Sequence, residues 1–197
     1  MRCDEPDGPP RSDSVSRPSR ELLLAIVRAA EDSVQASSVE VLIAFDRCGR
    51  EVLRKQGMHD SVLMTPAEVL LIHGAIVTHN HPHGWTFPPE DPRHQGNSFS
   101  LQDVSLAMVA QVAEMRVVTP RWRYVLRPGC EQVWSEDFFQ QVVAPAYRLV
   151  DRQVRSDFMA AVRAGRMTIE QVIAEHFHEV WMRVAARTGV HYDRESS

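Results

Sequence analysis

Two histidines and an aspartate have the types and the spacing of metal ligands. His79 and His81 are separated by one residue, and they follow residues 75–78, a short apolar segment rich in β-branched side chains. Residues i and i+2 of a strand point to the same side, so both imidazoles can approach one ion. Asp103 stands at the expected start of a helix, where its carboxylate can face the end of the strand. Taken alone, this pattern is a weak indication of a metal site.

Such a set has the donor chemistry of a catalytic zinc site. Two imidazole nitrogens and one carboxylate oxygen leave a fourth tetrahedral position open for water. Zinc lowers the pKa of such a water toward ~7, which makes hydroxide available at neutral pH. Hydrolysis also needs a general base within hydrogen-bond reach, and this base is commonly a glutamate. The three residues therefore predict a zinc-dependent hydrolase, provided that the fold supplies a base.

The surrounding sequence predicts the elements that must bring these residues together. Ser19 and Thr65 are expected N-caps, and Thr65, Pro66 and Glu68 have the pattern of a capping box. The order of elements predicts a mixed α/β (α+β) domain over residues 20–135. In chain order we expect a helix at 20–34, a hairpin at 39–45 and 50–54, a helix at 65–73, a strand at 75–78, a helix at 100–115, and strands at 116–119 and 123–127.

Both ends of the chain differ from this domain. Residues 1–19 hold four prolines and almost no apolar side chains, so they cannot bury enough surface to offset the entropy of ordering, and we expect a disordered tail. Residues 136–197 are expected to form a helical extension, with one helix that bends at Pro145 and a second that ends at a Gly189 C-cap. Packing on the α/β domain, homodimerisation and docking of a partner are all open roles for this extension.

Composition excludes several classes of protein. The chain has 197 residues, 44% of them hydrophobic, and a formal net charge of −4, as in an ordinary globular domain. No apolar run approaches the ~20 residues of a membrane helix. The sequence pI of about 6.1 argues against nucleic acid as a partner. Cys3, Cys48 and Cys130 show no paired spacing, so we expect no disulfide framework and a reducing, cytoplasmic compartment.

The residues around the histidines and the aspartate add a family resemblance. The segment Thr78-His79-Asn80-His81-Pro82, followed by Ser100-x-x-Asp103 at a helix start, resembles the signature of the JAMM/MPN (JAB) metalloprotease family. The likeness is to its RadC-like branch, which carries an HNHPSG motif. Residues 38–130 follow the order of that branch's first hairpin, helix and central strand. The resemblance implies an MPN/cytidine-deaminase-like mixed sheet flanked by helices.

The resemblance also implies a role for each residue of the motif. His79, His81 and Asp103 match the family's zinc ligands. Ser100 matches the serine that helps to stabilise the oxyanion, and Glu40 stands where the general base and acid is expected. The implied reaction is hydrolysis of a peptide or isopeptide amide, with Glu40 passing a proton from water to the leaving amine. The implied substrate is a protein or peptide; a ubiquitin-like tail, a cell-wall peptide and the chain itself are open alternatives.

Two features depart from the family pattern. The family places about half as many residues between the second histidine and the aspartate as the twenty-one, residues 82–102, that stand here. Long loops in compact domains are often functional, so the insertion at 83–97 is either a substrate-binding loop or lid, or a block over the site. Glu51 is a rival to Glu40, because a one-residue slip in the hairpin register would reverse every side chain.

Several of these residues also have simpler explanations. Ser100 and Asp103 fit an ordinary N-terminal capping pattern, which is compatible with metal ligation, and Glu40 fits a solvated strand face. The competing function keeps the fold without catalysis: an MPN/RadC-like interaction module, in a phage or toxin context, whose insertion and C-terminal helices form the partner surface.

Four further histidines are expected to stay outside the chemistry. His83 and His94 fit solvated positions of the insertion, although both are candidate extra ligands. His176 and His178 are two residues apart on an expected helix, so they do not share a face, and we expect them to be solvated.

Overall fold

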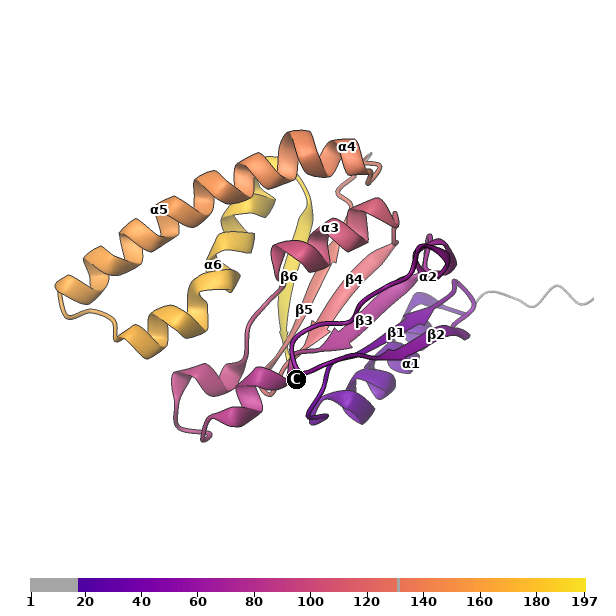
Figure 1. Ribbon diagram of the computed structural model, residues 1–197, viewed down its shortest axis with the longest axis horizontal. Helices are drawn as coiled ribbons and strands as arrows, with labels where there is room; N and C mark the ends of the chain where they lie inside the picture. Colours follow the sequence, from indigo (N-terminus) through magenta and orange to yellow (C-terminus); the bar gives the residue numbers. More distant parts are fainter. Residues whose placement is uncertain (1–17, 131) are drawn as a thin grey trace, which may run out of the picture.

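One mixed six-stranded sheet organises the computed structural model, which describes residues 18–130 and 132–197 (Figure 1). The strand order is β2-β1-β3-β4-β5-β6; β3 and β4 are parallel and all other neighbours are antiparallel. The mixed α/β class expected from the sequence is confirmed, whereas the tail expected at 1–19 lies outside the described residues except for its last two. The strands are β1 (Val41–Phe45), β2 (Glu51–Gln56), β3 (Ile76–Asn80), β4 (Glu114–Val118), β5 (Trp122–Arg127) and β6 (His191–Ser196).

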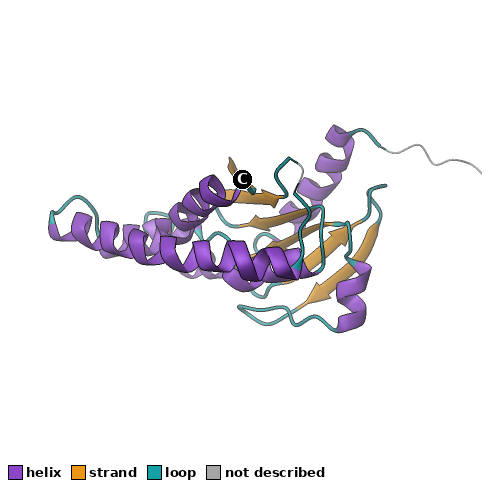
Figure 2. Ribbon diagram, turned by 90° about the horizontal axis from the view of Figure 1, so that it is seen from above, coloured by secondary structure: helices purple, strands orange, loops and turns teal. Residues whose placement is uncertain are grey.

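Helices cover both faces of this sheet (Figure 1). α1 (Arg20–Val34) packs on one face, and α3 (Leu101–Val109), α5 (Ala144–Arg163) and α6 (Ile169–Thr188) cover the other. α5 and α6 form a helical pair that extends beyond the edge of the sheet (Figure 2). The shorter elements are α2 (Pro66–Leu71), α4 (Glu136–Phe138), the 3-10 turns η1 (Pro82–Thr86) and η2 (Pro92–Gln95), and the π-helical turn η3 (Phe139–Val143).

The helix boundaries follow the capping residues. Ser19 Oγ accepts a hydrogen bond from the backbone N–H of Leu22, and the capping box of Thr65 and Glu68 is formed at α2. Gly189 ends α6 in the left-handed conformation at φ 76°, where a residue without a Cβ is favoured. These three sequence-based predictions are confirmed.

Side-chain alternation along the strands divides the core between the two faces. Leu42 and Ala44 of β1 pack in the core under α3 and α6, whereas Ile43 and Phe45 pack against α1. The larger core is closed by the fully buried Trp181 of α6, whose indole N–H donates to the carbonyl of Phe99 at 2.7 Å. α6 therefore belongs to the same core as the sheet.

Two predicted elements were wrong in part. The helix expected at 100–115 ends at Val109, because Gln111 adopts φ 52° and Met115 and Val117 are buried as alternate residues of β4. The helical extension ends at the expected Gly189 cap, but the chain then returns to the sheet in a strand that was not predicted, and this strand, β6, pairs antiparallel with β5. This strand lies at the sheet edge and is mostly polar, so it lacks the apolar alternation that predicts a strand.

The bend expected at Pro145 takes the form of a π-helical turn. η3 directly precedes α5, and Pro145 stands in the first turn of α5. Proline has no N–H and its ring collides with the carbonyl four residues earlier, so a wider turn relieves the clash.

Cys48 and Cys130 are free thiols. Within the described ranges, no helix is long and apolar enough to cross a membrane.

Candidate metal centre

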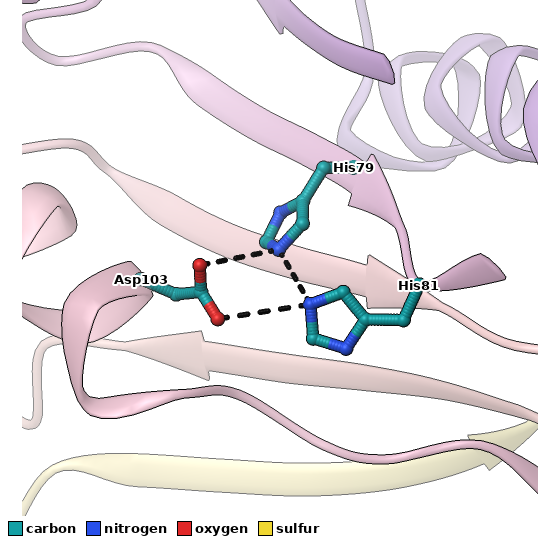
Figure 3. Close-up of side chains that lie close together, drawn as sticks. All are labelled: His79, His81 and Asp103. Atoms are coloured by element: carbon teal, nitrogen blue, oxygen red, sulfur yellow. Dashed lines mark hydrogen bonds and ion pairs between the residues drawn. The ribbon is translucent and has the colours of Figure 1, made fainter. Parts of the chain in front are cut away.

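The end of β3 places both histidines on the α3 side of the sheet (Figure 3). His79 is in β3, where it pairs with Val117 of β4. His81 follows the strand, but its backbone is still extended and its N–H donates to the carbonyl of Val118 at 3.0 Å. The alternation of the strand therefore continues to His81. Pro82 then begins η1 and ends the pairing, because proline cannot donate to the ladder.

The start of α3 brings Asp103 to the same place. The backbone N–H of Ser100 donates to Asp103 Oδ2 at 2.6 Å, and Ser100 Oγ accepts from the N–H of Asp103 at 3.2 Å. This reciprocal capping box fixes the carboxylate at the helix terminus. The capping hydrogen bond occupies Oδ2, which also faces His81, and Oδ1 is left to face His79.

The three side chains converge on a single point (Figure 3). The two Nε2 atoms of His79 and His81 are 3.1 Å apart. Asp103 Oδ1 is 3.5 Å from His79 Nε2, and Asp103 Oδ2 is 3.7 Å from His81 Nε2. A tetrahedral zinc with bonds of about 2.0–2.2 Å holds its ligand atoms roughly 3.3–3.5 Å apart. The two imidazole nitrogens and the Asp103 carboxylate therefore lie within a few tenths of an ångström of the separations that such an ion requires.

The tautomer of His81 also suits a metal. His81 Nδ1 lies 3.0 Å from the carbonyl oxygen of Asn97. Because a carbonyl only accepts, Nδ1 carries the proton and Nε2 presents a lone pair. Metal-bound histidines usually have such a carbonyl or carboxylate behind the ring. The donor set and its support therefore fit a metal ion.

Burial and mutual charge set the protonation states at this site. Burial lowers the pKa of His81 to about 4, and neighbouring His79 acts in the same direction. Burial opposes ionisation of Asp103, but the charge and hydrogen bond of His79 outweigh it and the pKa of Asp103 is lowered. Burial also disfavours the charged form of His79, yet Asp103 and Glu40 raise its pKa. A neutral His81 and an ionised Asp103 are the states that bind a metal.

Glu40 lies across the same cleft and is only 8% exposed. It directly precedes β1, and its Oε1 is 3.9 Å from His81 Nε2. Burial raises the pKa of Glu40 to about 7; His79 opposes this shift and Asp103 adds to it. The structure therefore brings the expected base to the three ligands.

Asn80, between the two histidines, holds the backbone on either side of Glu40. Its side chain points to the opposite face of β3 and is fully buried. Its Oδ1 accepts from the N–H of Val41 at 2.7 Å, and its Nδ2 donates to the carbonyl of Val39 at 3.1 Å. Sequence reasoning gave Asn80 no role, although its place inside the His-Asn-His motif was a signal.

Some of the other candidate residues line the cleft, and others lie outside it. Glu51 is exposed on β2 and its carboxylate is held by Arg54 at 2.7–2.8 Å, so the structure places Glu40, not its rival, at the site. Ser100 and His83 are among the residues that line the cleft, together with Glu40, His81 and Asp103, and the cleft has a volume of about 280 Å³. His94 Nδ1 lies 2.9 Å from the carbonyl of Phe87, away from these ligands.

The insertion at 83–97 packs beside the cleft and does not fill it. Gln95 Nε2 donates to the carbonyl of Ala174 on α6 at 2.8 Å, and Trp85 Nε1 donates to the carbonyl of Gln35 at 2.7 Å. Only the ends of the segment, His83 and Asn97, reach the cleft wall. The middle of the insertion instead joins α6 to the rest of the domain.

The expectation that His176 and His178 are solvated was wrong. His176 Nε2 lies 2.7 Å from Asp151 Oδ1 of α5. His178 Nδ1 lies 2.9 Å from the hydroxyl of Tyr192 on β6. Both pairs depend on where α6 meets other elements, which the periodicity of α6 alone does not reveal.

No family model, curated protein or solved structure matches this chain. The likeness to JAMM/MPN proteins therefore depends on the motif residues alone.

Proposed function

We propose that this chain is a zinc-dependent hydrolase of peptide or isopeptide amides, similar to the RadC-like branch of JAMM/MPN proteins. The observation that carries the proposal is the triangle formed by His79 Nε2, His81 Nε2 and the Asp103 carboxylate. The two nitrogens are 3.1 Å apart, Oδ1 is 3.5 Å from His79 and Oδ2 is 3.7 Å from His81. Mixed imidazole and carboxylate donors suit zinc among the common divalent ions.

The residues around this triangle have separate roles in amide hydrolysis. A divalent ion held there supplies Lewis acidity for the scissile carbonyl and lowers the pKa of a water molecule toward ~7. Glu40 accepts a proton at its carboxylate and returns it to the leaving amine. A carboxyl group whose pKa is raised to about 7 by burial can both hold and release a proton near neutral pH.

Ser100 supports the charge that develops on the substrate oxygen. Its Oγ accepts from the N–H of Asp103, so its hydroxyl proton remains available to donate into the cleft that it lines. Preorganised donors of this kind are worth about 10²–10³ in rate. Asn97 keeps His81 in the tautomer that presents Nε2.

Metal content and peptide cleavage test this proposal together. We expect the chain, purified without chelator, to bind one equivalent of zinc by elemental analysis and to cleave peptides of a digested proteome, read by mass spectrometry. His81→Ala should lose the zinc. Glu40→Gln should keep the zinc but slow cleavage by about 10²–10⁴.

Glu51→Gln is the matched control, because Glu51 is a carboxylate of the same hairpin outside the cleft. It should keep both zinc and cleavage. Absence of zinc at every pH tested would contradict the proposal. Zinc binding without cleavage would instead favour a non-catalytic interaction module with the same fold.

A further inference from the structure

An apolar groove lies between α5 and α6, next to the metal cleft. It has a volume of about 380 Å³, and its apolar walls include Met159 of α5 with Val172, Ile173 and Phe177 of α6. Met159 is 42% exposed and Ile173 is 44% exposed, although the same helices bury other apolar side chains in the core. Sites for apolar ligand groups have such walls together with a few polar groups.

The groove adjoins the metal cleft. Asn97 and Phe177 line both, and the carbonyl of Asn97 is the partner of His81 Nδ1 at 3.0 Å. The groove is thus lined by a residue that is in direct contact with a proposed metal ligand. An extended peptide advances about 3.3–3.6 Å per residue, so a side chain close to an amide at the metal centre can reach it.

The charges beside the groove already satisfy one another. Arg155 Nε donates to Asp151 Oδ2 at 2.9 Å, and the other oxygen of Asp151 is 2.7 Å from His176 Nε2. A charged ligand would have to compete with this arrangement. An uncharged apolar side chain is therefore the complementary occupant.

We propose that this groove takes a large apolar side chain, of the size of leucine, methionine or phenylalanine, from a peptide whose amide lies at the metal centre. The inference rests on the proposed hydrolase function and adds its substrate class: peptides with a large apolar residue near the scissile bond. A second copy of this chain is the competing occupant, but covering the groove in that way would not require the groove to share wall residues with the cleft.

A pair of metal-binding probes tests the groove without depending on turnover. Acetyl-Gly-Gly hydroxamate and acetyl-Leu-Leu hydroxamate share the metal-binding group and differ only in their apolar side chains. We expect calorimetry with the zinc-loaded full chain to show the Leu-Leu probe binding at least about tenfold more tightly, as burial of one leucine side chain predicts. Ile173→Asp should remove most of this preference and leave the affinity for the Gly-Gly probe unchanged.

Ile169→Asp is the matched control, because Ile169 is 46% exposed on the same helix but does not line the groove. It should keep the Leu-Leu preference. Equal affinities of the two probes for the wild-type chain, or a preference that survives Ile173→Asp, would overturn the groove proposal and leave the metal centre standing. Failure of both probes to bind would overturn the metal centre and the groove together. Equal affinities with a dimer that Ile173→Asp dissociates, measured by light scattering, would assign the groove to a second copy.

Discussion

Asp103 uses its two carboxylate oxygens differently. Oδ2 accepts from the N–H of Ser100 at 2.6 Å and completes the capping box, whereas Oδ1 faces His79 at 3.5 Å. A helix cap and a proposed metal ligand are thus combined in one side chain. The two roles can be separated, because an amide can still accept the capping hydrogen bond but is a much poorer metal ligand.

Loss of a residue that only supports a metal ligand typically lowers metal affinity by ~10–100-fold. We therefore expect Asp103→Asn, which changes a proposed ligand itself, to lower zinc affinity by more than this. Without metal, its free energy of unfolding should fall by less than about 1 kcal/mol, since only the charge near the helix terminus is lost. Competition with a chromogenic chelator measures the first quantity, and urea unfolding measures the second.

Ser100→Ala is the opposite control. It removes the cap and should cost about 1 kcal/mol of stability, while zinc affinity stays close to that of the wild type. Equal zinc affinities of Asp103→Asn and the wild type would remove Asp103 from the ligand set.

At the scale of elements, β6 supports the cleft from a distance. The hydroxyl of Tyr192 lies 2.9 Å from Ser98 Oγ and 2.9 Å from His178 Nδ1. Ser98 adjoins Asn97, whose carbonyl holds His81. The last strand and α6 therefore help to fix the segment behind His81, a proposed metal ligand.

Tyr192→Phe removes this link while keeping the ring. We expect zinc affinity to fall by about tenfold, at the lower end of the range for residues that support a ligand. Competition with a chelator measures it. Tyr147→Phe, which changes a half-buried tyrosine packed on Trp181, should leave zinc affinity unchanged. An equal effect of both variants would mean that only general stability is involved.

The start of α2 is tied to β2 by a pH-dependent ion pair. Lys55 Nζ donates to both oxygens of Glu68 at 2.8 and 2.6 Å, and the N–H of Thr65 donates to one of them at 2.7 Å. These hydrogen bonds lower the pKa of Glu68 from 4.5 to about 2, and the hydrogen bond from Lys55 has the largest effect on this pKa. A lowered pKa in the folded state stabilises the fold above the unfolded pKa, and this stabilisation is lost as pH falls.

We expect Glu68→Gln to unfold at a lower urea concentration than the wild type at pH 6. The difference should shrink as pH falls from about 4.5 toward 2, because the wild type loses the same interaction on protonation. Glu90→Gln, at an exposed position of the insertion, should follow the wild type throughout. A difference that stays constant down to pH 3 would show that the charge of Glu68 does not contribute.

Local patterns predicted that His79, His81 and Asp103 lie close together, but they did not predict the walls of the cleft. Alternation along β3 and the helix start at Ser100 were sufficient to bring His79, His81 and Asp103 together, because both signals are local. The contributions of Asn97 and Phe177 arise from where the insertion meets α6, through contacts such as Gln95 to Ala174. Local periodicity carries no information about such distant pairings, and the mostly polar β6 was missed for the same reason.

At the scale of the whole molecule, one buried carboxylate joins α1 to three strands. Glu31 is fully buried. It accepts from Arg116 Nε at 2.6 Å, from Arg123 Nε at 2.9 Å and from Thr78 Oγ1 at 3.1 Å. Arg116 also donates to Glu114 at 2.8 Å. The network lies on the face of the sheet opposite the metal centre, so it should govern stability without touching the ligands.

Removing this carboxylate should be among the most destabilising changes in the chain. Glu31→Ala leaves Arg116, which is 2% exposed, without its main partner, and breaking a buried pair in this way typically costs about 3–5 kcal/mol. Urea unfolding should show this loss, while Glu21→Ala at an exposed position of the same helix should change stability by less than about 1 kcal/mol. The triple variant Glu31→Leu/Arg116→Met/Arg123→Met should recover part of the stability, because it removes the buried charges that face one another across α1 and the sheet. Glu114 then loses Arg116 but still has Arg20 at 3.8 Å and Arg127 at 4.0 Å. A triple variant as unstable as Glu31→Ala would show instead that the network itself, and not the avoidance of unpaired charge, holds α1 on the sheet.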